Sequence, residues 1–293
     1  MTSPSPALTE AATSRFVSVR LAEKSFKVHY NDAGGDAHGS QTVVMLHGSG
    51  PGATGWGNFG RSVGAFVSAG YRVLTLTFPG WGKSDPVVCT GSRPELNARF
   101  LQGFLDALDV GGRVRLMGNS MGAHSALAFA LACPERVDRL VLIGGGMGST
   151  SIFQPALTEG IRRMHDVYRK PSLERVKDML DVLLFDSRTL TQEAMQAVLD
   201  NVLARPEHLA NFIRSIDENP RQYPDVSSRL GEVTAPTLLV WGRDDRFVPL
   251  DVGLRLLAGM PNADMHVIGG CGHGVLLEHS QKVNRMALDF FEN

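Results

Sequence analysis

The sequence predicts an α/β fold in which a mostly parallel sheet is flanked by helices and carries a helical cap insertion. Short apolar runs typical of buried strands alternate with stretches of helical periodicity, and several of these runs end in glycine-rich loops. The alternation stops between residues 149 and 229. Repeated strand–helix units favour a parallel sheet covered on both faces, and functional residues of such sheets gather at the carboxyl ends of the strands.

Composition limits the classes of function. The chain has 293 residues, 43% hydrophobic and 20% charged, as expected for one large folded core with an insertion. The net charge of −1 argues against a nucleic-acid partner. No run of 18 apolar residues occurs, so we expect no membrane span. Three cysteines and no signal-peptide pattern in residues 1–15 indicate a reduced, intracellular protein.

The elements of the first half of the chain are expected in a simple order. Residues 1–14 are small and polar and predict a mobile arm. Residues 15–30 alternate imperfectly and predict an antiparallel hairpin at a sheet edge. The remaining segments of this first core part, residues 15–148, are strands at 43–46, 72–76, 114–117 and 139–143 and helices at 97–108 and 120–132.

The second half contains the insertion and the end of the core. Residues 149–229 show helical periodicity without strands, which predicts a cap lying over the sheet. Strands return at 237–241 and 265–268, with a helix at 252–257. Residues 230–293 are therefore expected to complete the core.

The central motif is Gly118-Asn119-Ser120-Met121-Gly122, a G-x-S-x-G sequence between a predicted strand and a predicted helix. In this nucleophile elbow the turn is sharp, and side chains in place of the glycines would collide with the neighbouring strand and helix. The turn lifts the serine hydroxyl above the sheet, and the N-terminus of the helix offers N–H groups to an oxyanion. Ser120 is the predicted nucleophile.

A serine nucleophile needs a base and an acid that orients the base. Asp245 follows the strand at 237–241, and His273 follows the strand at 265–268, in the order serine, acid, histidine. Asp244 is an alternative acid, but Asp245 is preferred because it lies three residues after Gly242, which ends the strand. The sequence predicts the catalytic triad Ser120, Asp245 and His273.

The loop that follows the strand at 43–46 completes the predicted site. It reads His47-Gly48-Ser49-Gly50, a position suited to an oxyanion loop, and we predict the N–H groups of Gly50 and Met121 as donors. Ser49 is a candidate contact to the substrate. Histidine, cysteine and acidic residues show no metal-ligand spacing, so we expect no metal ion.

These motifs together resemble the meta-cleavage product hydrolases, carbon–carbon bond hydrolases of aromatic catabolism with the α/β-hydrolase fold. The resemblance extends from about residue 11 to the C-terminus, and the motifs that carry it are LHGSGPGATGW, PGWGKSD, LNAR, GNSMG, the GGG after RLVLI, WGRDDRFVPLD and CGH. Together they are far more specific than the elbow alone.

The resemblance implies the chemistry. The substrate would be a 2-hydroxy-6-oxo-2,4-dienoate made by ring fission, ketonised by the enzyme and attacked at C6 by serine. The C5–C6 bond would break to give 2-hydroxypenta-2,4-dienoate and a carboxylic acid. The resemblance further implies no cofactor, a cytoplasmic location, a homo-oligomer (dimer or tetramer), and substrate contacts from Asn58 and Asn119.

The sequence departs from the family pattern where the substrate is held. The family has tryptophan after the catalytic histidine, an arginine on a cap helix and a pocket phenylalanine. The corresponding residues here are Gly274, Val198 and Leu183. Ala123 and Thr77 replace a glycine after the elbow and an aspartate before PGWG. A charge-assisted hydrogen bond contributes roughly 1.5–3 kcal/mol, so the missing arginine should weaken recognition of an acidic dienol.

Three functions remain open at this level. The first is hydrolysis of the C5–C6 bond of a ring-fission product. The second is a carboxylesterase or other acyl hydrolase with an enlarged apolar pocket, since the same triad cleaves esters. The third is a non-catalytic ligand-binding protein on a hydrolase scaffold, which the intact triad disfavours.

Overall fold

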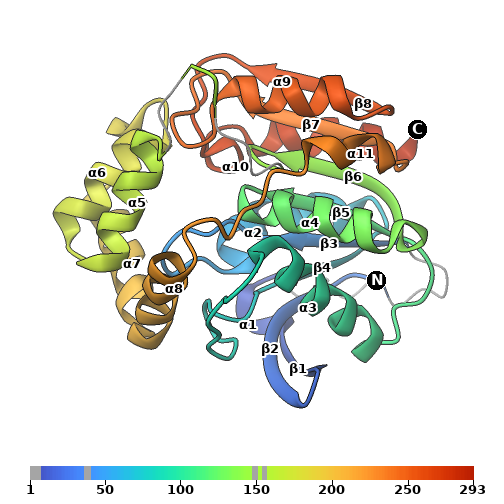
Figure 1. Ribbon diagram of the computed structural model, residues 1–293, viewed down its shortest axis with the longest axis horizontal. Coiled ribbons are helices and arrows are strands. Elements are labelled where there is room, and N and C mark those ends of the chain that lie inside the picture. The colour runs from blue at the N-terminus through green and yellow to red at the C-terminus, as the bar shows by residue number, and fades with distance from the viewer. Residues whose placement is uncertain (1–7, 36–40, 147–150, 154–156) are drawn as a thin grey trace, which may run out of the picture.

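The computed structural model describes residues 8–35, 41–146, 151–153 and 157–293. Within them, eight strands form one sheet in the order β1-β2-β4-β3-β5-β6-β7-β8 (Figure 1). Only the β1–β2 and β2–β4 pairs of this sheet are antiparallel. The strands are β1 (Ser14–Leu21), β2 (Lys24–Ala33), β3 (Thr42–Leu46), β4 (Arg72–Leu76), β5 (Val114–Asn119), β6 (Val137–Ile143), β7 (Thr237–Gly242) and β8 (Ala263–Ile268).

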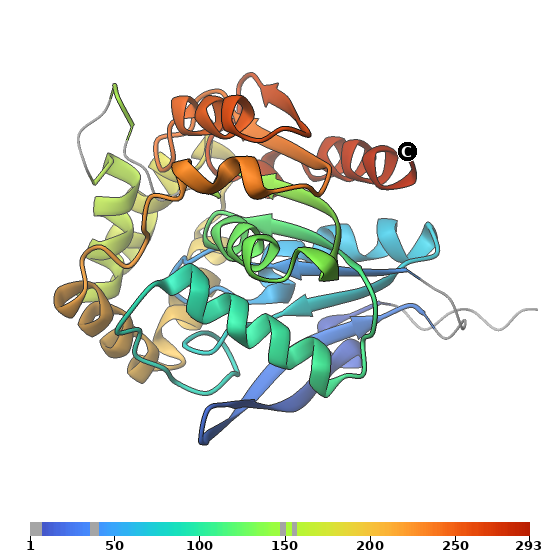
Figure 2. The ribbon, with the colours of Figure 1, turned by 45° about the vertical axis from the view of Figure 1, so that its right-hand side comes forward.

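Helices cover both faces of the sheet, as Figure 2 shows. On one face lie α3 (Arg93–Ala107), α4 (Met121–Ala132) and α9 (Leu250–Gly259); on the other lie α2 (Gly55–Ser68), α10 (Val275–Glu278) and α11 (Ser280–Glu292). The predicted α/β class with a parallel central sheet is confirmed.

Each sheet face has its own apolar core because successive strand residues point to opposite sides. In β3, Val44 and Leu46 join the core under α3 and α4, whereas Val43 and Met45 join the core under α2 and α11. All four side chains are fully buried. The continuous apolar runs of the sequence are therefore strands buried on both sides.

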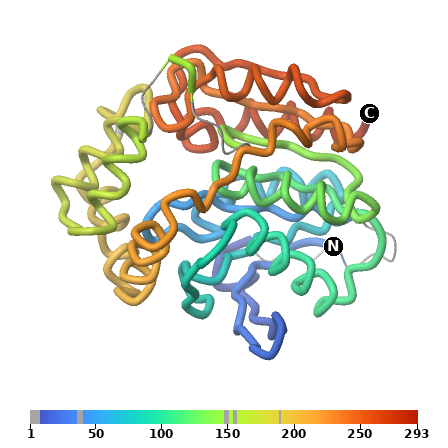
Figure 3. The backbone as a smooth tube through the Cα atoms, viewed as in Figure 1, coloured from blue at the N-terminus to red at the C-terminus, as the bar shows by residue number. Residues whose placement is uncertain are grey.

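The helices of the predicted cap lie between β6 and β7. They are α5 (Glu159–Arg169), α6 (Leu173–Leu183), α7 (Gln192–Leu203) and α8 (Pro206–Glu218), with a short 3-10 turn at Ser187–Thr189. They form a separate layer at one end of the sheet (Figure 3). A further 3-10 turn, Ser227–Glu232, packs against α9 of the core. The expected core–cap boundary at residues 148 and 149 lies outside the described residues.

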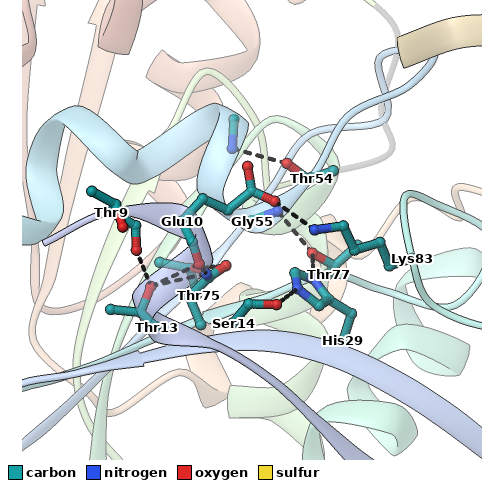
Figure 4. A network of polar contacts seen from close by, with 12 residues as sticks. Thr9, Glu10, Thr13, Ser14, His29, Thr54, Gly55, Thr75, Thr77 and Lys83 are labelled. Carbon is teal, nitrogen blue, oxygen red and sulfur yellow. Dashed lines mark hydrogen bonds and ion pairs between the residues drawn. The ribbon is translucent and has the colours of Figure 1, made fainter.

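The expected mobile arm needs a correction. Residues Glu10–Thr13 form helix α1, capped by Thr9, and the chain enters β1 at Ser14 (Figure 4). The Asn31 amide donates to Glu10 O and to Thr13 Oγ1, both at 3.0 Å. These contacts come from a distant strand, so the small, polar composition of the segment did not reveal them. Residues 1–7 lie outside the described part.

Among the described residues, none of the helices has the length and apolar character needed to cross a membrane.

Candidate active site

Ser120 sits in a strained turn between β5 and α4. Its backbone has φ 52° and ψ −116°, which a non-glycine residue rarely adopts. Its N–H donates to Ile143 O at 2.8 Å, which pins the turn against β6. A Cβ atom at Gly122 would lie 1.9 Å from Leu46 O, and one at Gly118 would lie 2.4 Å from Gly122 O. The glycines of the motif are thus required by backbone contacts.

The three predicted triad residues form one hydrogen-bonded chain. Ser120 Oγ lies 3.0 Å from His273 Nε2, and His273 Nδ1 lies 2.7 Å from Asp245 Oδ2. Asp245 and His273 are buried. A proton on Nδ1 directed at the carboxylate leaves Nε2 free to accept the serine proton.

The loop after β7 places Asp245, and not Asp244, against His273. Asp245 Oδ1 accepts the N–H groups of Phe247 and Val248 at 2.7 and 2.8 Å, which fixes the carboxylate. The Phe247 ring stacks on the His273 ring with centroids 4.9 Å apart. Asp244, the alternative acid, instead accepts from Gly270 N at 3.0 Å and does not contact His273.

His47 holds the loop that was predicted to bind the oxyanion. The imidazole is fully buried, and burial lowers its pKa to about 4, so it is neutral at pH 7. It accepts from Phe78 N at 3.0 Å and donates to Gly48 O at 2.7 Å. The ring therefore links the ends of β3 and β4.

A pair of asparagines joins this loop to the elbow. Asn58 Oδ1 accepts from Gly48 N and from Asn119 Nδ2, both at 3.0 Å. The other amide oxygen, Asn119 Oδ1, is buried and has no hydrogen-bond partner within the described part of the chain. An unused acceptor beside Ser120 suits a donor group of a ligand.

The site opens into a cavity of about 150 Å³ between core and cap. Of the predicted residues, those that line it are Ser49, Gly50, Asn58, Asn119, Ser120, Leu183, His273 and Gly274. Met121 is buried at the first position of α4, where the helix provides no partner for its N–H. Val198 does not line the cavity: it is half-buried on α7 and packs against the apolar core.

The cap takes up the space beside Gly274. Gly274 N donates to Leu183 O at 3.0 Å, and a Cβ atom on this glycine would lie 2.5 Å from Leu184 Cδ2. A large side chain at position 274 would therefore require Leu184 to move.

Tyr168 connects the cap to the predicted oxyanion loop, and no sequence pattern pointed to it. Its hydroxyl donates to Ser49 O at 2.7 Å and accepts from Trp81 Nε1 at 3.0 Å. Burial raises the pKa of Tyr168 well above its usual value, so the hydroxyl stays protonated. The helical pattern of α5 gives no sign that this tyrosine faces the site.

Sequence reasoning also missed the apolar lining of the cavity. Phe247 lies two residues after Asp245 and could have been suspected from that spacing. The others sit on ordinary amphipathic surfaces and show no signal of their own: Ile161, Met164, Met179, Leu276 and Leu277.

A second cavity, of about 300 Å³, lies between α3, α4 and residues 224–229 and includes no triad residue. In the part of the chain that the structure describes, histidine, cysteine and acidic side chains form no group that could hold a metal ion.

The chain is similar to characterised proteins over nearly its full length. Residues 43–286 match the model of the alpha/beta hydrolase family. A 2-hydroxy-6-oxononadienedioate/2-hydroxy-6-oxononatrienedioate hydrolase of Cupriavidus pinatubonensis is 58% identical over 98% of both chains. The hydrolase of the same name in Escherichia coli is 52% identical over 96% of both.

Solved structures agree with these relatives. The meta-cleavage product hydrolase of Pseudomonas fluorescens superimposes with a TM-score of 0.84 at 28% identity, covering 96% of this chain and 98% of the other. The fold that carries Ser120, His273 and the cap is thus shared with this hydrolase. The chain therefore belongs to the alpha/beta hydrolase family and, within it, to the meta-cleavage product hydrolases.

Proposed function

We propose that this protein is a serine-dependent hydrolase that cleaves the C5–C6 bond of a 2-hydroxy-6-oxo-2,4-dienoate in the catabolism of aromatic compounds. The observation that carries the proposal is the hydrogen-bonded chain from Ser120 through His273 to Asp245, which ends in the cavity between core and cap. The names of relatives more than half identical to this chain support the substrate class.

The residues suggest a sequence of steps. Once the dienol has ketonised by gaining a proton at C5, His273 takes the Ser120 proton and Oγ bonds to C6. The N–H groups of Gly50 and Met121 stabilise the oxyanion. The C5–C6 bond then breaks, and its electron pair passes through the C3–C4 double bond to the C2 carbonyl, whose oxygen gains the proton held by His273, giving 2-hydroxypenta-2,4-dienoate and a neutral His273. Water activated by His273 releases the acyl group as a carboxylic acid.

Further features belong to the same proposal. Residues 15–148 and 230–293 would form the catalytic core, and residues 149–229 the cap. The enzyme would act in the cytoplasm as a homo-oligomer (dimer or tetramer), without a cofactor, a metal ion, or a nucleic-acid or membrane partner. The balanced net charge of −1 supports the absence of a nucleic-acid partner.

The test is spectrophotometric. A ring-fission dienol is generated by an extradiol dioxygenase, and its visible absorbance is followed with the wild-type protein and with Ser120→Ala. We expect rapid decay with the wild type and a loss of at least about 10³-fold in the variant, with the fold unchanged. A fluorophosphonate should label the wild type alone. Equal decay with both proteins would refute Ser120 as the nucleophile.

A carboxylesterase is the second candidate. It is favoured by one observation: the residues that line the cavity include no lysine or arginine to hold a carboxylate. Dienol that persists while Ser120 is still labelled, and while simple esters are cleaved, would favour this alternative.

A further inference from the structure

Among the described residues, the cavity beside Ser120 lacks the charged side chains that would bind an acidic group of a substrate. Its lining residues include no lysine, arginine, aspartate or glutamate, and His273 is the titratable side chain among them. The segments outside the described residues, 1–7, 36–40, 147–150 and 154–156, contain no lysine or arginine in the sequence. Every lysine and arginine of the chain therefore belongs to the described part.

Most cations of the cap make contacts away from the cavity. Arg163 pairs with Asp178 at 3.4 Å, and Arg169 pairs with Asp217 at 2.6 Å, all on half-exposed or exposed surface. Other cap cations make similar surface contacts with acidic side chains or carbonyl groups, namely Arg162, Lys177, Arg188, Arg205 and Arg214.

Arg93 is buried, and two of its guanidinium nitrogens have partners, whereas Nη1 has none among the described residues. It donates to Gln222 Oε1 at 3.2 Å and to Ser215 Oγ at 3.3 Å, and it lies 5.3 Å from the centre of the Trp81 ring. It does not line the cavity. Arg93 thus joins α3 to the end of the cap.

A carboxylate already stands behind the cavity wall. Glu278 Oε1 accepts from Gly272 N at 2.8 Å and would lie 3.8 Å from a Cβ atom at Gly274. Gly274 itself lines the cavity. A second carboxylate on a bound substrate would meet this negative charge without a cation to offset it, and burying an unpaired charge is costly.

Apolar side chains line the cavity from both the cap and the core. Met164, Met179 and Leu183 come from α5 and α6 of the cap, and Phe247 and Leu276 come from the core. The methionines are flexible and fit an apolar group of irregular shape. The amide groups of Asn58 and Asn119 contact each other and the N–H of Gly48 at the polar side of the site.

We infer that the C6 substituent of the substrate, which leaves as part of the carboxylic acid, is an uncharged alkyl or aryl group and not a chain that ends in a second carboxylate. Met164, Met179, Leu183 and Phe247 determine this specificity. The inference rests on the proposed function. By this inference, the preferred substrate of this chain differs from that in the names of its relatives, which specify a nonadienedioate, a compound with two carboxylates.

The experiment compares two ring-fission products, 2-hydroxy-6-oxo-6-phenylhexa-2,4-dienoate and 2-hydroxy-6-oxonona-2,4-dienedioate. We expect kcat/KM for the phenyl compound to exceed that for the dioate by at least about tenfold, which corresponds to about 1.4 kcal/mol. Equal values, or a preference for the dioate, would overturn the inference.

A positive charge introduced into the cavity lining should change the ratio of the kcat/KM values for the two compounds. Leu183→Arg should move the preference toward the dioate by at least about tenfold, and the shift should shrink at high salt because it depends on an ion pair. Leu183→Met, which keeps the lining apolar, should retain the preference for the phenyl compound. Leu277→Arg introduces a positive charge on the core side of the cavity. Leu277 is 41% exposed, so an arginine at this position should not disturb the fold. No shift in folded variants of either kind would count against the inference.

A pair of esters separates failure of the inference from failure of the proposed function. The acyl chains of p-nitrophenyl hexanoate and mono-p-nitrophenyl adipate have equal length, and the second ends in a carboxylate. If neither dienol is consumed but Ser120 cleaves esters, the proposed carbon–carbon hydrolysis fails, while a preference of at least about tenfold for the hexanoate still supports an uncharged acyl group. A preference for the adipate overturns the inference. Loss of all four reactions overturns both.

Discussion

Ser120 and the residues around it are positioned by backbone contacts more than by their own side chains. The serine has a strained backbone, and the glycines on either side leave no room for a Cβ atom. The histidine is fixed by a carboxylate that two backbone N–H groups hold in place. Substitutions of the triad side chains should therefore change the chemistry and leave the fold intact, whereas substitutions of the glycines should disturb the fold.

Two neighbouring aspartates offer a matched test of the triad. Asp245→Asn should lower kcat by up to about 10⁴-fold, because the amide no longer holds His273 in the tautomer that accepts the Ser120 proton. Asp244→Asn removes the charge of a carboxylate that contacts Gly270 N, outside the triad, and should lower kcat less than tenfold. Kinetics on one ester substrate suffice. Comparable losses in the two variants would disprove the assignment of the acid.

Two glycines test the backbone argument. Gly122→Ala forces a Cβ atom to within 1.9 Å of Leu46 O, so we expect a loss of several kcal/mol or failure to fold. Gly64 lies in α2 with no atom within 4 Å of its added Cβ. Gly64→Ala should raise the free energy of unfolding by about 0.5–1 kcal/mol without changing activity. Urea denaturation measures both. A stable Gly122→Ala protein would contradict the packing of the elbow.

Among the elements, those bounded by local signals were predicted well and those set by tertiary packing were not. The strands at 72–76 and 139–143 follow from apolar runs that end at glycine or proline, and they agree with β4 and β6 within two residues. The triad followed from motifs at strand ends. The roles of its residues stay part of the proposal, although the structure brings them together.

Helix α2 shows why other elements escaped prediction. Four glycines in residues 55–68 weaken its helical propensity, yet Phe59, Val63 and Phe66 bury one stripe against the sheet. Gly55 is required where a Cβ atom would lie 2.8 Å from Leu76 O. The lining of the cavity escaped for a related reason: the face of a cap helix that turns toward Ser120 depends on how the helices pack. Val198 was expected there because it occupies the position of the family's cap arginine, and no pattern in the sequence marked Met179.

The contact between α5 and the predicted oxyanion loop can be tested by removing the hydroxyl of Tyr168. Tyr168→Phe removes the bond to Ser49 O and leaves Trp81 Nε1 without its acceptor, so we expect a loss of about 1–2 kcal/mol in stability and a several-fold drop in kcat/KM. Tyr30→Phe removes a hydroxyl in β2, away from the cavity, and should leave kcat/KM unchanged. If both variants keep full kcat/KM, the link has no functional role.

For the molecule as a whole, the buried His47 and the half-buried His124 contribute to the response to acid. Burial lowers the pKa of His47 and His124 to about 4, with His273 also lowering that of His124. The unfolded chain takes up these protons near pH 6.5, whereas the folded protein resists until about pH 4. Stability is therefore complete above pH 6.5 and falls as the pH drops toward 4. For His47 the loss has an upper limit of about 3 kcal/mol.

Urea denaturation at pH 7.5 and pH 5.0 measures this effect above the range in which most carboxylates titrate. The free energy of unfolding should be lower at pH 5.0, and His124→Gln should show a smaller difference between the two conditions than the wild type. Equal stability of the wild type at both pH values would mean that these histidines are protonated in the folded state.

The two ends of the cap lie close together, since Gly146 and Pro224 line the same cavity of about 300 Å³. Strands β6 and β7, between which the cap is inserted, are direct neighbours in the sheet. The pairing of β6 with β7 therefore does not depend on the inserted residues. A gene segment for this layer can be exchanged by recombination while the reactive centre is inherited intact, so new substrate preferences can arise in such a lineage without the chemistry being invented again.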